Sequence, residues 1–173
     1  MKNSSLTKRL CRAGVIAALY VALTYAFMPF AFGPLQVRPA EALCILPLFF
    51  PESVLALFIG CALSNIASPY AVYDITIGAS ATLLAAVATW LIGKIFQKDW
   101  LRIVLGGIFP VLINAFAIPL VIVFLCGGGE GYSSVVVAYF TYVGSLLLTE
   151  SVWVYGLGTP LYFGIKRIIN KRK

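Results

Sequence analysis

Carboxylates, amides and aromatic rings are the groups with which this 173-residue chain could do chemistry, because it contains no histidine. Histidine-based acid–base catalysis and histidine metal sites are therefore excluded. The glycine-rich stretch 127–131 is not followed by Lys and Ser or Thr, so the chain has no phosphate-binding P-loop with which to hydrolyse ATP. Its cysteines lie in apolar runs without a CxxC spacing, which favours buried free thiols over a redox or metal site. They are Cys11, Cys44, Cys61 and Cys126.

Glu150 is the most informative carboxylate, because it lies within the long apolar segment Val135–Ile165. At about 1.5 Å per residue from Lys166, it falls in the outer half of a membrane-embedded helix. A carboxylate in that position costs several kcal/mol unless it meets a partner, and by default it marks a functional site. Two interpretations stay open: Glu150 binds a ligand, or it forms a structural pair with Arg38.

Further polar and aromatic residues fall on the same outer side in the topology derived below. Amides and carboxylates can bind the donor and acceptor edge of a ligand, whereas Tyr and Trp can stack on a flat ring. Each aromatic residue alone fits an interfacial belt, but together these types predict an outward-facing site for a small, flat, polar molecule rich in N–H donors. The candidates are Glu150, Asn114, Asn65, Asp74, Glu41, Arg38, Gln36, Tyr70, Tyr139 and Trp153, with Phe32, Tyr73, Tyr142 and Thr149 on the same side.

The composition indicates that these residues belong to an integral membrane protein. Hydrophobic residues make up 61% of the chain, charged residues only 11%, and the mean hydropathy is +0.98. A soluble domain typically carries about 25% charged residues, and a core of this size could not bury so much apolar surface. A soluble enzyme, a disordered chain and a nucleic-acid-binding protein are therefore excluded, despite the net charge of +7.

Hydropathy predicts an all-α protein with one transmembrane domain of six helices, covering residues 1–173. Four segments reach the length of about 20 apolar residues that a span needs. The stretch between the first and second of these is broken by Pro47, Pro51 and Glu52, and it predicts two short helices. The predicted helices cover about 13–32, 41–50, 52–67, 75–95, 102–125 and 134–167.

The basic residues predict how these helices are oriented in the cell membrane. With both termini in the cytoplasm, twelve of the thirteen Lys and Arg residues lie on the cytoplasmic side, and only Arg38 lies outside. Five helices would place the basic clusters on opposite sides, against the positive-inside rule. Glu52 and Asp99 then fall at cytoplasmic turns among basic residues, where we expect them to cap helices or form ion pairs.

Small residues at four-residue spacing in the first helix predict a close helix–helix contact. Ala13 and Ala17 begin this pattern near the cytoplasmic end, and such ladders let two helices approach closely in a membrane. On spacing alone, docking of a partner protein and ordinary packing within the chain are both open.

Several stretches resemble the QueT family of substrate-binding (S) subunits of energy-coupling factor (ECF) transporters. They are FGPLQVRPAEALCIL from residue 32, FFPESVLALFIGCALSNI from residue 49, RAGVIAALYVALTYAF in the first helix and TESVWVYGLGTPLYF near the end. The resemblance implies a six-helix S-component fold with cytoplasmic termini and a ligand site near the outside. It also implies import of a queuosine precursor, which is a 7-deazaguanine derivative.

The resemblance further implies partner subunits and roles for individual residues. S subunits dock through an alanine-spaced face of the first helix, here Ala13 and Ala17, onto a transmembrane coupling subunit joined to two ATPases. This chain itself would then need no cofactor, since the partner subunits use the ATP.

The N1–H and amine of a deazaguanine suit a single carboxylate, with Glu150 as first choice and Asp74 or Glu41 as alternatives. We expect Asn65, Asn114 or Gln36 to meet the carbonyl edge, and Tyr70, Tyr139 or Trp153 to stack on the ring. Arg38 and Glu41 are three residues apart, so a structural pair between them is a further interpretation. An S subunit or stand-alone carrier for another vitamin, and a small membrane enzyme or assembly factor, remain as alternative functions.

Overall fold

The computed structural model describes residues 2–31 and 36–171, and these residues form helices without any strand. The chain is therefore an all-α membrane protein, as its hydropathy predicts. Elements η1 and η2 are 3₁₀ segments, and η3, η4 and η5 are π-helical. In order, the elements are α1 (Lys2–Ala26), α2 (Met28–Ala31), η1 (Pro39–Leu48), α3 (Ser53–Ser64), η2 (Asn65–Ala67), α4 (Ala71–Tyr73), η3 (Asp74–Gly78), α5 (Ala79–Ile95), α6 (Asp99–Leu120), η4 (Val121–Leu125), α7 (Val135–Ser151), η5 (Val152–Leu157) and α8 (Gly158–Lys171).

Four helical segments of the described chain are long and apolar enough to cross a membrane. Two shorter apolar segments, Pro39–Leu48 and Ser53–Ala67, lie between the first and second of the long ones. Each is too short to span a hydrocarbon core of about 30 Å as a straight α-helix perpendicular to the membrane. The long segments are Ser5–Ala26, Ala71–Ile95, Asp99–Leu125 and Val135–Lys171.

Several helices begin or end at residues other than those predicted. Helix α1 starts at Lys2, before the predicted residue 13, and ends at Ala26. Helix α6 starts at Asp99 because an acidic residue in the first turn interacts favourably with the helix dipole. Helix α8 continues to Lys171, a basic residue in the last turn, which the same dipole favours. Phe32, within the predicted first helix, lies outside the described residues.

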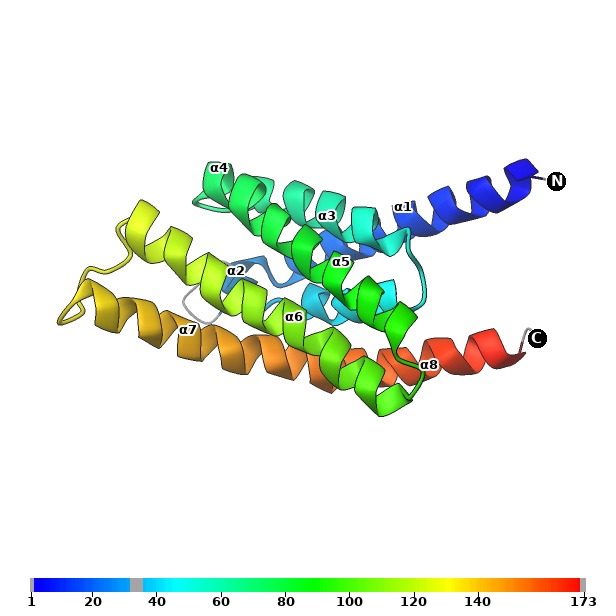
Figure 1. Cartoon of the computed structure of the whole chain (residues 1–173). Coiled ribbons are helices and arrows are strands. Elements are labelled where there is room, and N and C mark those ends of the chain that lie inside the picture. The colour runs from blue at the N-terminus through cyan, green and yellow to red at the C-terminus, as the bar shows by residue number, and fades with distance from the viewer. Residues whose placement is uncertain (1, 32–35, 172–173) are drawn as a thin grey trace.

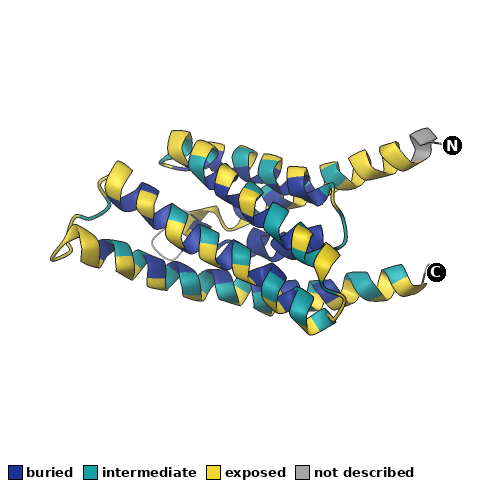
Figure 2. Cartoon of the chain, viewed as in Figure 1, coloured by how far each residue is buried: buried dark blue, intermediate teal, exposed yellow. Residues whose placement is uncertain are grey.

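Segment η1 is a buried 3₁₀ helix where an α-helix over 41–50 was predicted. Pro39 stands in its first turn, where a missing N–H is tolerated, whereas Pro47 inside the segment removes a hydrogen-bond donor. Every residue of η1 is buried, and the segment packs against α1, α5, α6 and α8. Figure 2 shows this dark-blue segment in the centre of the bundle. Because η1 runs through the interior, it carries the side chain of Glu41 into the core.

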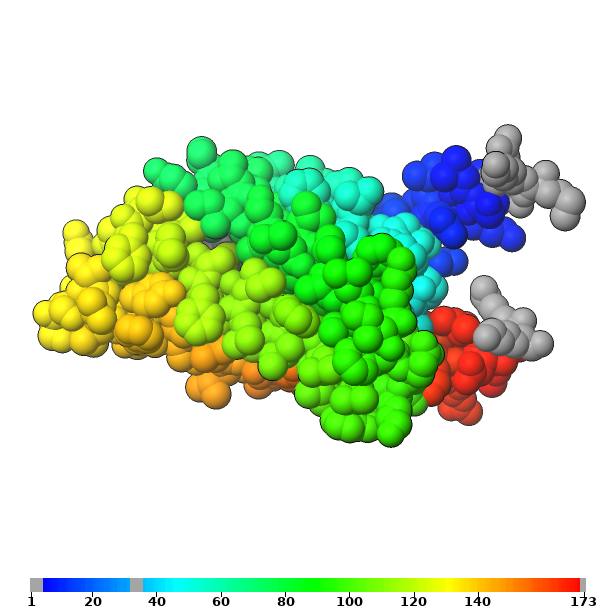
Figure 3. Space-filling model, viewed as in Figure 1, coloured from blue at the N-terminus to red at the C-terminus, as the bar shows by residue number. Residues whose placement is uncertain are grey.

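The two ends of the described chain lie at the same end of the molecule, and the loop between η4 and α7 lies at the opposite end (Figure 1). In the space-filling view, the N-terminal part of α1 and the C-terminal part of α8 both project from this end of the molecule (Figure 3). Two ion pairs stabilise this end, Arg12–Glu52 at 2.7 Å and Lys166–Asp99. The prediction that these two acids pair with basic residues is thus confirmed.

Helices α1 and α3 pack closely because a glycine stands where they meet. A Cβ added at Gly60 would lie 2.9 Å from Cβ of Tyr20 and 3.1 Å from the carbonyl oxygen of Ala17. Real Cβ atoms essentially never lie as close to another atom as 2.9 Å, and 3.1 Å to a backbone oxygen is unusually tight, so a side chain at this position must push the helices apart. The backbone of Ala17 therefore takes part in packing within the chain.

We predict that Gly60→Ala lowers the stability of the purified protein, although alanine favours a helix by about 1 kcal/mol over glycine. Overpacking of this kind costs about 1–3 kcal/mol, which a thermal unfolding experiment in detergent would detect. Gly144→Ala is the matched control, because an added Cβ there meets nothing within 4 Å. Equal or higher melting temperatures for both variants would contradict the close α1–α3 contact.

Candidate functional site

Glu41 is held in the core by donors from three different elements. Its Oε1 accepts a hydrogen bond from the hydroxyl of Tyr20 on α1. Its Oε2 accepts from Sγ of Cys44 at 3.1 Å and from Nδ2 of Asn114 on α6 at 3.3 Å. A carboxylate that is 1% exposed requires such partners, so Glu41 is the centre of a polar cluster within an apolar bundle.

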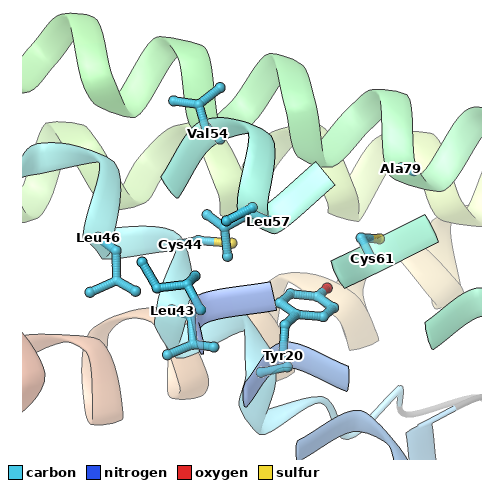
Figure 4. Close-up of a cluster of buried hydrophobic side chains, with 12 residues drawn as sticks. Tyr20, Leu43, Cys44, Leu46, Val54, Leu57, Cys61 and Ala79 are labelled. Atoms are coloured by element: carbon cyan, nitrogen blue, oxygen red, sulfur yellow. The ribbon is translucent and has the colours of Figure 1, made fainter. Parts of the chain in front are cut away.

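Tyr20 and the two buried cysteines are members of this cluster that the sequence did not identify as site residues. Figure 4 shows Tyr20 among Leu57, Cys44 and Cys61, with its ring in the hydrophobic core. A tyrosine in the middle of the apolar first helix was the available signal, but only the fold shows its partner. Cys44 and Cys61 are buried free thiols as predicted, whereas the free thiols Cys11 and Cys126 are exposed and partly exposed, against the prediction.

Glu150, near the end of α7, interacts with the same cluster. The side chain is 4% exposed and interacts electrostatically with Glu41 and Arg38. It also hydrogen-bonds with Asn114, which therefore links the two glutamates. Oxygen Oε2 of Glu150 has no hydrogen-bond partner among the described residues.

Arg38 is a buried cation that interacts electrostatically with these acids. Its Nε donates to the carbonyl oxygen of Ala31 at 2.9 Å, which ties the segment after residue 35 back to α2. Its charge interacts with both Glu41 and Asp74. The charge of Arg38 therefore acts both on a glutamate and on a second group of polar side chains, which begins at η2.

That second group consists of Asn65, Ser68 and Asp74, at the end of the molecule opposite the termini. Nδ2 of Asn65 donates to the carbonyl oxygen of Asp74 at 2.8 Å, and the hydroxyl of Ser68 donates to Oδ2 of Asp74. All three side chains are buried. This leaves Oδ1 of Asp74 and Oδ1 of Asn65 without a partner in the part of the chain that is described.

Unpartnered acceptors are the property that distinguishes this cluster from ordinary core packing. A buried polar atom without a hydrogen bond costs about 1–3 kcal/mol, so four such oxygens call for donors that the described residues do not supply. Both Asp74, at the start of η3, and Glu150, two residues before η5, adjoin π-helical turns, which are frequent at functional sites. The four acceptor atoms are Gln36 Oε1, Asn65 Oδ1, Asp74 Oδ1 and Glu150 Oε2.

The three aromatic candidates are distributed differently from the polar ones. Tyr70 is half-buried beside Ser68. The backbone N–H of Tyr70 donates a hydrogen bond to Oγ of Ser68 at 3.0 Å. The ring of Tyr139 packs on exposed Phe124, and its hydroxyl donates to a backbone oxygen of α6, so it fits an interfacial belt. Trp153 is half-buried on η5, and no hydrogen bond within the described chain joins it to the acids.

The alanine ladder borders a separate, apolar groove toward the end that holds the termini. This groove has a volume of about 450 Å³ and is formed by α1 and α3. Ala13 and Ala17 contribute to its wall, beside Gly14 and Ala56, and Glu52 lies at its edge. Ala17 packs against Gly60 and also faces the groove. Its position is therefore consistent with packing within the chain and with docking of a partner.

Comparison with known proteins supports a transport function for this arrangement. The model of a family described as QueT transporter matches residues 10–167. The chain belongs to the QueT transporter family. This is a family of transporters, which confirms both the resemblance noted in the sequence and the prediction that the chain is not an enzyme.

The chain is also similar to the queuosine precursor transporter QueT of Lactococcus lactis subsp. cremoris (strain MG1363). The chain is 31% identical to it over 102 residues, which are 58% of this chain and 59% of the relative. The chain thus spans less than two thirds of the relative's length. No solved structure matches the chain.

We predict that Tyr20→Phe destabilises the protein by about 1–3 kcal/mol, because Oε1 of Glu41 would lose its donor while remaining buried. Tyr25→Phe on the same helix is the control, since Tyr25 is exposed. Thermal unfolding of the two purified variants compares them directly. If both variants melt at the same temperature, Glu41 is not held by Tyr20 as described.

Proposed function

We propose that the chain is the substrate-binding S subunit of an ECF-type importer in the cell membrane, spanning it six times with both termini cytoplasmic. In this proposal it binds a queuosine precursor, a 7-deazaguanine derivative, at an outward-facing site. A transmembrane coupling subunit and two ATPases then use ATP to complete the import. The family membership and the relative's name support the substrate, and both termini lying at one end of the molecule supports the topology.

The buried acceptor oxygens are the observation that carries the binding proposal. A deazaguanine presents an N1–H and an exocyclic amine side by side, and a single carboxylate can accept from both. Glu150 is our first choice, because its Oε2 is buried and unpartnered. Asp74 and Glu41 are the alternatives, but Glu41 already accepts three hydrogen bonds from the protein.

The remaining candidates take supporting roles in this proposal. Asn114 links the two glutamates and can orient Glu150 toward the ring, while Asn65 and Gln36 offer acceptor oxygens. Tyr70 is the best placed of the aromatic candidates to stack on a ring, because it adjoins the polar group around Ser68. Arg38 balances part of the negative charge.

The groove between α1 and α3 supports the proposed partner. It is almost entirely apolar, lies toward the end that carries both termini, and includes Ala13 and Ala17. A transmembrane helix of a coupling subunit suits such a surface, since small residues let backbones approach closely. The sequence itself has no P-loop, so hydrolysis of ATP falls to the partner subunits.

A second candidate function is an S subunit or stand-alone carrier for another vitamin. The groove favours a subunit that docks over a carrier that acts alone. Calorimetry with the purified chain and a panel of deazapurines and vitamins, without ATP, separates the substrates. Clear binding of a different vitamin and none of any deazaguanine would overturn our assignment.

We predict that Glu150→Gln lowers the affinity for a deazaguanine about 100-fold while the protein stays folded. The amide places an NH₂ against a ligand donor, and losing about 2.8 kcal/mol of charge-assisted bonding corresponds to two factors of ten. Calorimetry gives the affinity, and thermal unfolding gives the stability of the same sample. Glu130→Gln, in the exposed loop before α7, is the control and should bind normally. A variant with lower stability but unchanged affinity would show that Glu150 only pairs within the protein.

We predict that Gly14→Trp abolishes assembly with the coupling subunit and uptake, and leaves ligand binding by the isolated subunit intact. Gly14 lines the groove, and an added side chain meets nothing within the protein. Ala13→Trp and Ala17→Trp should block assembly too, but Ala17 also packs against α3. Val15→Trp is the control, because Val15 is exposed on the other side of α1. Co-purification with the ATPases measures assembly, and normal assembly of the Gly14 variant would contradict docking at this groove.

A further inference from the structure

Helix α1 contributes to both the apolar groove and the polar cluster, through two residues that lie one turn apart. Ala17 lines the groove, and the hydroxyl of Tyr20 donates a hydrogen bond to Oε1 of Glu41. Residues three apart are neighbours on the surface of a helix. A single turn of α1 therefore joins the groove to the carboxylate at the centre of the cluster.

Gly60 on α3 determines how deeply Tyr20 reaches into the core. A Cβ added at Gly60 would lie 2.9 Å from Cβ of Tyr20 and 3.1 Å from the carbonyl oxygen of Ala17, so α1 rests directly on this glycine. The side chain of Tyr20 is only 1% exposed, and its ring lies in the hydrophobic core (Figure 4). A change in the spacing between α1 and α3 therefore moves the Tyr20 hydroxyl relative to Glu41.

Glu41 stays buried when this hydroxyl moves away, so another donor has to replace it. Its remaining donors are Sγ of Cys44 and Nδ2 of Asn114. A thiol is a weak donor, which leaves the amide of Asn114 as the group that can compensate. The bond from Asn114 to Glu41 measures 3.3 Å, beyond the usual range of about 2.7–3.2 Å, so it has room to shorten.

Asn114 also hydrogen-bonds with Glu150, the carboxylate that we propose to bind the ligand. An amide that is drawn toward Glu41 moves away from Glu150. The free oxygen Oε2 of Glu150 then loses the support that orients it. The position of Glu150 thus depends on Tyr20, through Glu41 and Asn114.

We propose that Tyr20 is a positioning residue, which makes the affinity for the ligand depend on the spacing between α1 and α3. This inference rests on the proposed function, in which Glu150 binds the ring of a deazaguanine. The same two helices form the groove, so a partner helix that spreads them lowers the affinity and favours release of the ligand. Rigid helices and hydrogen-bond networks are the elements that carry such coupling between two sites.

A double-mutant cycle on the full-length purified protein tests this dependence by calorimetry, with 7-deazaguanine and its 7-aminomethyl derivative as probes. We expect Tyr20→Phe to lower the affinity about 10-fold, which corresponds to the net contribution of one hydrogen bond. Gly60→Ala keeps every donor but spreads the helices, and it should lower the affinity at least about 3-fold. In the Tyr20→Phe background, Gly60→Ala should change the affinity by less than about 2-fold, because the bond through which the spacing acts is already absent.

Two matched controls should bind the probes as the wild-type protein does. Tyr25→Phe removes an exposed hydroxyl from the same helix, and Gly144→Ala adds a Cβ that meets nothing within 4 Å. A merely structural role would lower the melting temperatures of Tyr20→Phe and Gly60→Ala and leave their affinities unchanged. That result, or losses of affinity that add up in the double variant, would overturn the role of Tyr20 alone.

Two further outcomes are also decisive. If Tyr20→Phe does not fold, Gly60→Ala decides the question by itself, and an unchanged affinity of that variant overturns the proposal. Failure of the wild-type protein to bind either probe would contradict the proposed function, and this inference with it.

Discussion

The burial of carboxylates in an apolar bundle is the constraint on which the rest of this structure depends. Glu41 can lie in the core only because Tyr20, Cys44 and Asn114 bring donors to it from α1, η1 and α6. These contacts in turn fix how η1 passes through the centre of the bundle. Around this satisfied carboxylate the described residues leave other acceptors unpaired, and such groups in a native protein call for an explanation such as a bound water, ion or ligand.

The buried polar groups and the apolar groove lie toward different ends of the molecule. The polar group of Asn65, Ser68 and Asp74 lies away from the termini, whereas the apolar groove and the ion pairs Arg12–Glu52 and Lys166–Asp99 lie toward them. Segment η1 connects the two regions, since it begins near Glu41 and ends at Leu48, whose carbonyl accepts from Arg102 on α6. The proposed function assigns ligand binding to the polar groups and docking to the groove, and it leaves energy coupling to the partner subunits.

Much of this could be predicted from the sequence, because membrane helices obey length and charge rules that single residues reveal. The apolar runs predicted the long helices. The cost of burying a carboxylate in such a run identified Glu150 as a candidate site residue. The 3₁₀ form of η1 could not be predicted, because tertiary packing around Pro47 determines it. The hydrogen bond between Tyr20 and Glu41 could not be predicted for a similar reason. It joins residues from separate elements, and spacing along the chain carries no information about such contacts.

The most direct test of the central claim is an experimental structure of the purified protein with a deazaguanine bound. Our account predicts that ligand nitrogen atoms lie within hydrogen-bonding distance of Glu150 Oε2, in a site that also contains Asn114 and Asp74. A structure in which ordered water or other side chains satisfy these oxygens, and the ligand binds elsewhere in the chain, would contradict it.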